Sequence, residues 1–258
     1  MDHIKTEVDG NVLKITLNRP DKFNSFNRAM ALQMQEALDN AAADKNIRAV
    51  YLTAEGKAFC AGQDLGEAVD ANGPGIKKIV EEHYNPIIKK IRAIEKPVIC
   101  AVNGVAAGAG ANIALACDIV IAGASAGFIQ AFSKIGLIPD SGGTFFLPRL
   151  IGFQRASALM MLGDKVPAQE ALQIGMVYKV TADADLQTEA LKIAKTVSEM
   201  PTVAIGLTKK LLNQSAFNSL EKQLEAEATM QVQAAKSYDH NEGVKAFIEK
   251  RKALFKGE

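Results

Sequence analysis

The chain has 258 residues, 48% of them hydrophobic, so it can bury the core of one large domain or of a core with an appendage. Lys and Arg number 30 against 29 Asp and Glu, so no bulk charge favours binding to nucleic acid or to an anionic membrane. Three cysteines without CxxC spacing and three scattered histidines give no support for a metal site, and buried thiols in a reducing cytoplasm are expected.

The first 65 residues predict a hairpin, a helix and a further strand. Asp9-Gly10 is a tight-turn signal between two short extended segments. Asn27 can cap a helix whose apolar residues recur at helical spacing. Residues 49–53 predict a buried strand, which leads into the loop 59–65. Charged residues among the first nine interrupt any early apolar run, so no signal peptide is expected.

A helix and a strand are predicted in the second quarter of the chain. Apolar residues in 76–91 repeat at helical spacing, and Pro86 predicts a kink there. His83 lies on the apolar face of this helix, so we expect it to be a packed residue and not a catalyst. Residues 118–122 predict a strand.

Small and uncharged residues dominate the segment 97–117. Residues 97–102 predict a buried strand, and the small residues 104–112 let a ligand approach the backbone closely. The segment is long enough to cross a bilayer, but its asparagines and glycines favour a strand and a helix in a soluble protein. Gly108-x-Gly110 is not a dinucleotide fingerprint, because Ile113 stands at the third glycine position.

Residues 123–127 match the G-x-S-x-G pattern of serine hydrolases. A nucleophile elbow must be followed by a helix, whereas residues 128–132 look extended. The motif therefore predicts a turn of small residues between two strands.

Asp140 stands in a glycine-containing turn and has two interpretations. An Asp before Ser-Gly-Gly-Thr is a natural helix cap. Alternatively, one carboxylate beside a loop rich in backbone donors is equipped to move protons next to a carbonyl group. Capping does not explain why both this turn and the loop 104–110 are rich in glycine. This enrichment favours the catalytic interpretation.

The chain beyond Thr144 is mostly helical. Pro167 opens a helix that stops at Gly175, and residues 176–180 return to a strand. After a break at Pro201 only helices are predicted, with apolar stripes too thin to hold a core. We therefore divide the chain into a core, residues 1–200, and a C-terminal helical region, residues 201–258, which packs on the core or on a neighbouring subunit.

Eight short motifs together carry a family resemblance that covers essentially the whole chain. They are NRP at 18–20, AFCAGQDL at 58–65, KP at 96–97, NGVAAGAG at 103–110, ACD at 116–118, GLIP at 136–139, GGT at 142–144 and EGVKAF at 242–247. With them the chain resembles the crotonase (enoyl-CoA hydratase/isomerase) superfamily. The resemblance implies an α/β fold, a crotonase-like spiral of ββα units with a C-terminal helical trimerisation region.

The resemblance also implies an acyl-CoA thioester substrate, of which coenzyme A is a part, with no further cofactor and no metal. It implies that the backbone N–H groups of Gln63 and Ala109 form an oxyanion hole, although the family usually has Gly where Ala109 stands. The positions implied to bind CoA are Lys22, Phe23, Asn24, Ala61, Gly62, Asp64 and Leu65.

Departures from the hydratase pattern favour an isomerase. Enoyl-CoA hydratases of the family carry two glutamates, and Asn112 and Phe132 stand at those positions here, where they can position a substrate but cannot shuttle a proton. Asp140 stands where the dienoyl-CoA and ring-epoxide isomerases of the family carry an aspartate, which would make it the catalytic acid/base. One carboxylate can both remove and return a proton while an oxyanion hole carries the enolate charge.

Three hypotheses follow. The first is an acyl-CoA isomerase, in particular one that converts a ring epoxide to the seven-membered oxepin. The second is an enoyl-CoA hydratase of fatty-acid oxidation, and the third is a CoA-thioester-binding scaffold subunit with little activity.

The expected assembly is a homotrimer or a dimer of trimers. The alternative is a hetero-oligomer that contains a related hydratase. Neither nucleic acid nor a membrane is an expected partner.

Overall fold

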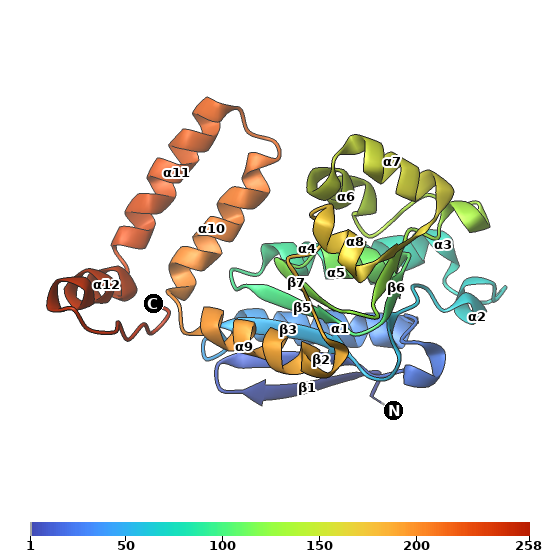
Figure 1. Ribbon diagram of the computed structural model, residues 1–258, viewed down its shortest axis with the longest axis horizontal. Coiled ribbons are helices and arrows are strands. Elements are labelled where there is room, and N and C mark those ends of the chain that lie inside the picture. The colour runs from blue at the N-terminus through green and yellow to red at the C-terminus, as the bar shows by residue number, and fades with distance from the viewer. Residues whose placement is uncertain (1) are drawn as a thin grey trace.

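Two β-sheets form the centre of the computed structural model, which describes residues 2–258 (Figure 1). The six-stranded sheet has the order β1 (Ile4–Asp9), β2 (Val12–Leu17), β3 (Ala49–Ala54), β5 (Val98–Val102), β7 (Ile119–Gly123) and β10 (Lys179–Thr181). The four-stranded sheet has the order β4 (Ala58–Cys60), β6 (Val105–Ala107), β8 (Gly127–Ile129) and β9 (Lys165–Pro167). The pairs β1–β2 and β8–β9 are antiparallel and the others are parallel.

The chain passes from one sheet to the other three times in succession. β3, β5 and β7 lie in the six-stranded sheet, and each is followed by its partner β4, β6 or β8 in the four-stranded sheet. Helices follow each of these strand pairs before the chain returns to the first sheet. This confirms the predicted α/β class and the spiral of ββα units.

Residues 2–258 contain twelve α-helices, most of which pack around the sheets. They are α1 (Arg28–Ala43), α2 (Leu65–Ala68), α3 (Gly75–Lys78), α4 (Asn85–Ala93), α5 (Ala109–Leu115), α6 (Gly143–Ile151), α7 (Phe153–Leu162), α8 (Ala168–Gln173), α9 (Leu186–Ser198), α10 (Thr202–Ser215), α11 (Leu220–Ala235) and α12 (Tyr238–Glu249). The predicted cap of α1 is confirmed, because Asn27 Oδ1 accepts a hydrogen bond from the Met30 N–H at 3.0 Å.

The kink predicted at Pro86 takes the form of a π-helical segment, Ile79–Tyr84, between α3 and α4. Pro86 lacks an N–H group, so the regular hydrogen-bond ladder of an α-helix cannot continue through it. His83 within this segment is fully buried, and its Nε2 lies 3.3 Å from Arg28 Nη1. It is therefore the packed residue that the sequence predicts.

The turn at residues 124–126 connects β7 directly to β8. This confirms the turn of small residues, since a nucleophile elbow would need a helix after it. The segment 97–117 divides into β5, β6 and α5. In the part of the chain that the structure covers, no helix is long and apolar enough to cross a membrane.

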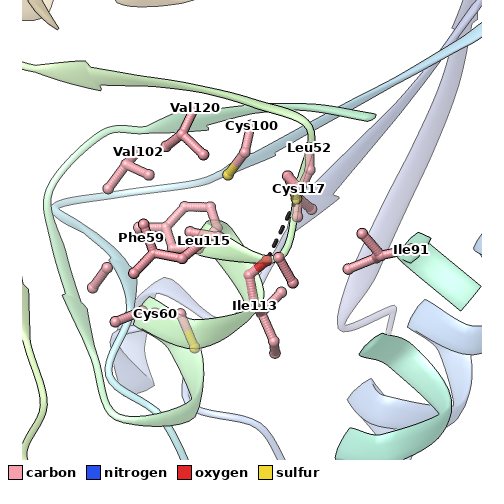
Figure 2. Packing of buried hydrophobic residues seen from close by; sticks show 14 of the residues in the cluster. Leu52, Phe59, Cys60, Ile91, Cys100, Val102, Ile113, Leu115, Cys117 and Val120 are labelled. Carbon is pink, nitrogen blue, oxygen red and sulfur yellow. Dashed lines mark hydrogen bonds between the residues drawn. The ribbon is translucent and has the colours of Figure 1, made fainter. Parts of the chain in front are cut away.

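The main hydrophobic core lies between the sheets and around α5. Figure 2 shows Phe59 of β4 beside Ile113 and Leu115 of α5, with the three cysteines buried nearby as free thiols. A second apolar cluster covers the other face of the six-stranded sheet, where α9 packs against β3 and β5. The central strands β3 and β5 are therefore buried on both faces, as their near-continuous apolar sequences require.

The helices α10, α11 and α12 extend away from the sheets (Figure 1). A charge cluster attaches α10 to the core: Asp118 lies 2.7 Å from both Lys209 Nζ of α10 and Arg92 Nη1 of α4. Asp118 Oδ2 also accepts the Val98 N–H at 2.8 Å. One carboxylate thus connects two helices to the start of a central strand.

We expect Asp118→Ala to lower the free energy of unfolding by about 3 kcal/mol, because it leaves the side chain of Lys209, which is 5% exposed, without its counter-ion. Urea unfolding followed by circular dichroism measures this loss. Lys5→Ala is the matched control, since the pair of Lys5 and Glu55 is about half exposed and should contribute less than about 1 kcal/mol. Equal losses in the two variants would contradict the role of Asp118.

Candidate active site

A cavity of about 480 Å³ lies between the loop after β4, the start of α5 and the segment before α6. Its wall includes every predicted site residue except Phe23, Asn24 and Asn112. The lining residues are Lys22, Ser25, Ala61, Gly62, Gln63, Asp64, Leu65, Gly66, Ala68, Ile76, Ile79, Val80, Tyr84, Gly108, Ala109, Ala131, Phe132, Ile135, Leu137 and Asp140.

Three predicted residues lie outside this wall. Asn24 is fully buried, and its Nδ2 donates to the carbonyl oxygens of Glu55 and Ala58, at 2.8 Å each. Its side chain therefore holds the loop in place. Phe23 is exposed beside Lys22, and Asn112 is buried behind the wall.

Two backbone N–H groups face the cavity from neighbouring loops. The Phe26 N–H donates to Gly62 O at 2.7 Å and the Asp64 N–H donates to Phe26 O at 2.8 Å, so the intervening Gln63 N–H points the other way. The Ala109 N–H belongs to the first residue of α5. Across residues 2–258, neither group has a protein acceptor.

The two loops that carry these donors are in close contact. A methyl group built on Gly62 would lie 3.0 Å from Ala107 O and 3.6 Å from Ala109 N. Two free N–H groups that converge on one cavity can stabilise an oxygen atom as it gains negative charge.

Asp140 faces the cavity from the turn before α6. Its Oδ1 accepts a hydrogen bond from Ser141 Oγ at 2.9 Å. Burial raises the pKa of this carboxyl group, and the Ser141 hydroxyl opposes that shift only in part. The helix begins at Gly143 with Gly142 as its cap residue and no side-chain cap, so the capping interpretation of Asp140 is wrong.

Asp64 is a second carboxyl group in the wall, but it is already paired. Its Oδ2 lies 2.8 Å from Arg19 Nη2 and its Oδ1 accepts the Gly66 N–H at 3.0 Å. Burial acts to raise the pKa of Asp64, yet Arg19 and backbone donors hold it below its usual value. The pKa values of the two carboxyl groups are therefore shifted in opposite directions. Asp140, whose pKa is raised, is the one suited to exchange protons.

Apolar side chains form much of the remaining wall. Phe132 lies against the start of α5, because a methyl group on Gly108 would come within 3.7 Å of its Cζ. Ile79, Val80, Ile135 and Leu137 also line the cavity. Such a lining accommodates an acyl group and keeps the local dielectric low, which strengthens interactions with the few polar groups.

Tyr84 is a lining residue that the sequence does not single out. Its Oη donates to Gln63 Oε1 at 2.8 Å, and Gln63 Nε2 donates to Glu67 Oε2 at 2.9 Å. Burial raises the pKa of Tyr84 well above its usual range, so the phenol remains a donor. The side chain of Gln63 is thus held at both ends, which fixes the backbone N–H that faces the cavity.

Comparison with known proteins gives a consistent set of relatives. A model of the enoyl-CoA hydratase/isomerase family matches residues 7–258. The 1,2-epoxyphenylacetyl-CoA isomerase of Escherichia coli K12 is 46% identical over 260 residues, which cover 100% of this chain and 99% of that protein. A probable enoyl-CoA hydratase of Rhodobacter capsulatus is 41% identical, with 98% of each chain covered. The crystal structure of an enoyl-CoA hydratase from Bacillus anthracis superposes with a TM-score of 0.95 at 34% identity, with 100% of both chains covered.

The opposite pKa shifts of the two carboxyl groups predict opposite effects on stability. A raised pKa means that ionised Asp140 destabilises the fold above that pKa, so Asp140→Asn should raise the melting temperature at pH 7. The gain should shrink as the pH falls through the carboxyl pKa, where the wild-type group becomes neutral. Asp64→Asn should lower the melting temperature at pH 7, and that loss should also fade in acid. Thermal unfolding at a series of pH values checks both signs, and a lower melting temperature for Asp140→Asn at pH 7 would contradict the burial argument.

Proposed function

The chain belongs to the enoyl-CoA hydratase/isomerase family, and we propose that within it the protein is an acyl-CoA isomerase, specifically a 1,2-epoxyphenylacetyl-CoA isomerase of phenylacetate degradation that forms the oxepin-CoA. The observation that carries this proposal is the carboxyl group of Asp140, which has no cationic partner within residues 2–258 and lines the same cavity as two residues with free backbone N–H groups. Asn112 and Phe132, where hydratases of the family carry glutamates, supply no second carboxyl group.

In the proposed mechanism the thioester oxygen accepts hydrogen bonds from the N–H groups of Gln63 and Ala109. The bond between the two epoxide carbons breaks and its electron pair becomes part of the double bonds of the seven-membered ring. Asp140 removes a proton from the carbon next to the thioester and returns one to a ring carbon, so the substrate and product have the same composition. The two N–H groups stabilise the negative charge that the thioester oxygen carries between the two steps. Lys22 and the loop 61–65 line the same cavity and would hold the CoA portion.

Enoyl-CoA hydration remains the second candidate, because the 41% identical relative from Rhodobacter capsulatus carries a hydratase name. The third is a CoA-thioester-binding scaffold. Offering the purified protein a 2-enoyl-CoA, a 3-enoyl-CoA and the ring epoxide separates the three. Fast addition of water to the 2-enoyl thioester would contradict the isomerase, and tight binding without turnover would favour the scaffold.

Replacing Asp140 by Asn tests the proton-transfer role directly. We expect turnover of the best substrate to fall by roughly 10²–10⁴-fold, the usual contribution of general acid–base catalysis. Affinity for the CoA thioester should barely change, because the amide is nearly isosteric and the proposed oxyanion hole is backbone. Steady-state kinetics together with calorimetric titration of an unreactive thioester measure the two effects.

Asn112→Ala is the control for this experiment. It should cost less turnover than Asp140→Asn, because it removes positioning and not proton transfer. Near wild-type turnover in a folded Asp140→Asn protein would end the single-carboxylate mechanism.

We also propose that the protein assembles as a homotrimer or a dimer of trimers through its C-terminal helices. Large apolar side chains on α10–α12 and the connecting segments are exposed in the single chain: Phe217, Leu220, Leu224, Phe247 and Ile248 are each 54–85% exposed. Exposed large apolar side chains in this number are typical of a subunit interface. The three free cysteines fit a reducing compartment, and we propose the cytoplasm.

Multi-angle light scattering at micromolar concentration should give the mass of three or six chains. Phe247→Glu, which places a charge in the proposed interface, should shift that mass towards one chain without unfolding it, since this side chain is 85% exposed. Lys5→Ala, which alters a surface far from α12, should leave the mass unchanged. A monomeric wild-type protein would refute the assembly.

A further inference from the structure

Two buried amide side chains lie in series behind Asp140. Gln130 Nε2 donates to Asn112 Oδ1 at 2.8 Å, and Asn112 Nδ2 donates to the Asp140 carbonyl oxygen at 2.8 Å. Gln130 is 4% exposed and Asn112 is 1% exposed. We propose that Gln130 is a positioning residue for the Asp140 turn and acts through Asn112; the inference rests on the catalytic role proposed for Asp140.

The direction of every hydrogen bond in this series is set by its last member. A carbonyl oxygen can only accept, so Asn112 must present its NH₂ group to Asp140. The Asn112 oxygen then faces Gln130, which must in turn present its own NH₂ group. Gln130 therefore supports the Asn112 orientation that the Asp140 carbonyl requires, by satisfying the Asn112 oxygen on the other side.

The turn that carries Asp140 needs such a support. Ser141 has φ +51° and Gly142 has φ +72°, so two successive residues adopt the left-handed conformation, which a serine rarely does. The Asn112 amide packs directly on this turn, since a methyl group on Gly143 would overlap it. The side-chain hydrogen bond of the Asp140 carboxylate comes from Ser141 in the same turn. The position of the turn at residues 140–142 therefore sets the position of the Asp140 carboxylate.

Stability alone does not account for the amide at position 130. Gln130 Oε1 is buried and has no hydrogen-bond partner among the described residues. An unsatisfied buried acceptor destabilises a fold, so this amide carries a cost that its one hydrogen bond, to Asn112, has to offset. The amide instead satisfies a requirement at Asn112 and Asp140, which is what a positioning role predicts.

The experiment is a double-mutant cycle between Gln130→Met and Asp140→Asn. In the wild-type background, Gln130→Met should lower kcat about tenfold with little change in KM, the kinetic equivalent of one lost hydrogen bond. In the Asp140→Asn background it should have almost no further effect, because the base that it positions is gone.

Two further variants separate positioning from general damage. Gln130→Leu also lacks a donor, so its kcat should fall as in Gln130→Met. Gln187→Met removes a comparable amide that bonds Tyr51 Oη and Thr53 Oγ1 on the far face of the sheet, and its kcat should stay at the wild-type level.

The outcomes distinguish this inference from the function on which it rests. Wild-type kcat in Gln130→Met, or an equal loss in both backgrounds, would overturn the positioning role while a low turnover of Asp140→Asn still supports the isomerase. Wild-type turnover in Asp140→Asn would overturn both. A tenfold loss that is confined to the Asp140 background and absent from Gln187→Met supports the inference.

Discussion

The close approach of two backbones, the loop after β4 and the start of α5, is the constraint on which the cavity depends. A methyl group on Gly110 would come within 2.6 Å of the Cys60 side chain and 2.5 Å of its carbonyl oxygen, so this contact requires glycine. The contact brings Gln63 and Ala109 to one wall. Burial raises the pKa of the Cys60 thiol to about 12, so the sulfur at this contact stays neutral and serves packing.

The same packing sets the electrostatics of the cavity. Two unpaired N–H groups provide a partial positive charge on one wall, and an apolar lining limits screening by water. Asp140 in the same cavity loses solvation without gaining a cationic partner, whereas Asp64 gains Arg19. Two carboxyl groups in one wall therefore serve different purposes: one stabilises the loop as a charged group, and the other has a pKa moved towards neutral pH.

The sequence predicts the elements that depend on local pattern and fails where a distant partner decides. The apolar runs of β3, β5 and β7, the Asn27 cap and the turn at residues 124–126 each follow from neighbouring residues alone. The role of the Asn24 side chain in holding its loop is not visible in the sequence, because its partners, Glu55 and Ala58, lie more than thirty positions away. Tyr84 and Gln130 were missed for the same reason, since only the fold brings them to Gln63 and Asn112.

Hydrogen-bond direction also explains why a second carboxyl group and the Asp140 turn are difficult to combine in this fold. An ionised carboxylate at position 112 has no donor to offer the Asp140 carbonyl, and its charge would raise the pKa of Asp140 further. The turn would then lose its side-chain support while Ser141 still held a left-handed conformation. An amide at position 112 is therefore compatible with the Asp140 turn, whereas a carboxylate there is not. A second carboxyl group at position 112 would need a different hydrogen-bonded framework around this turn.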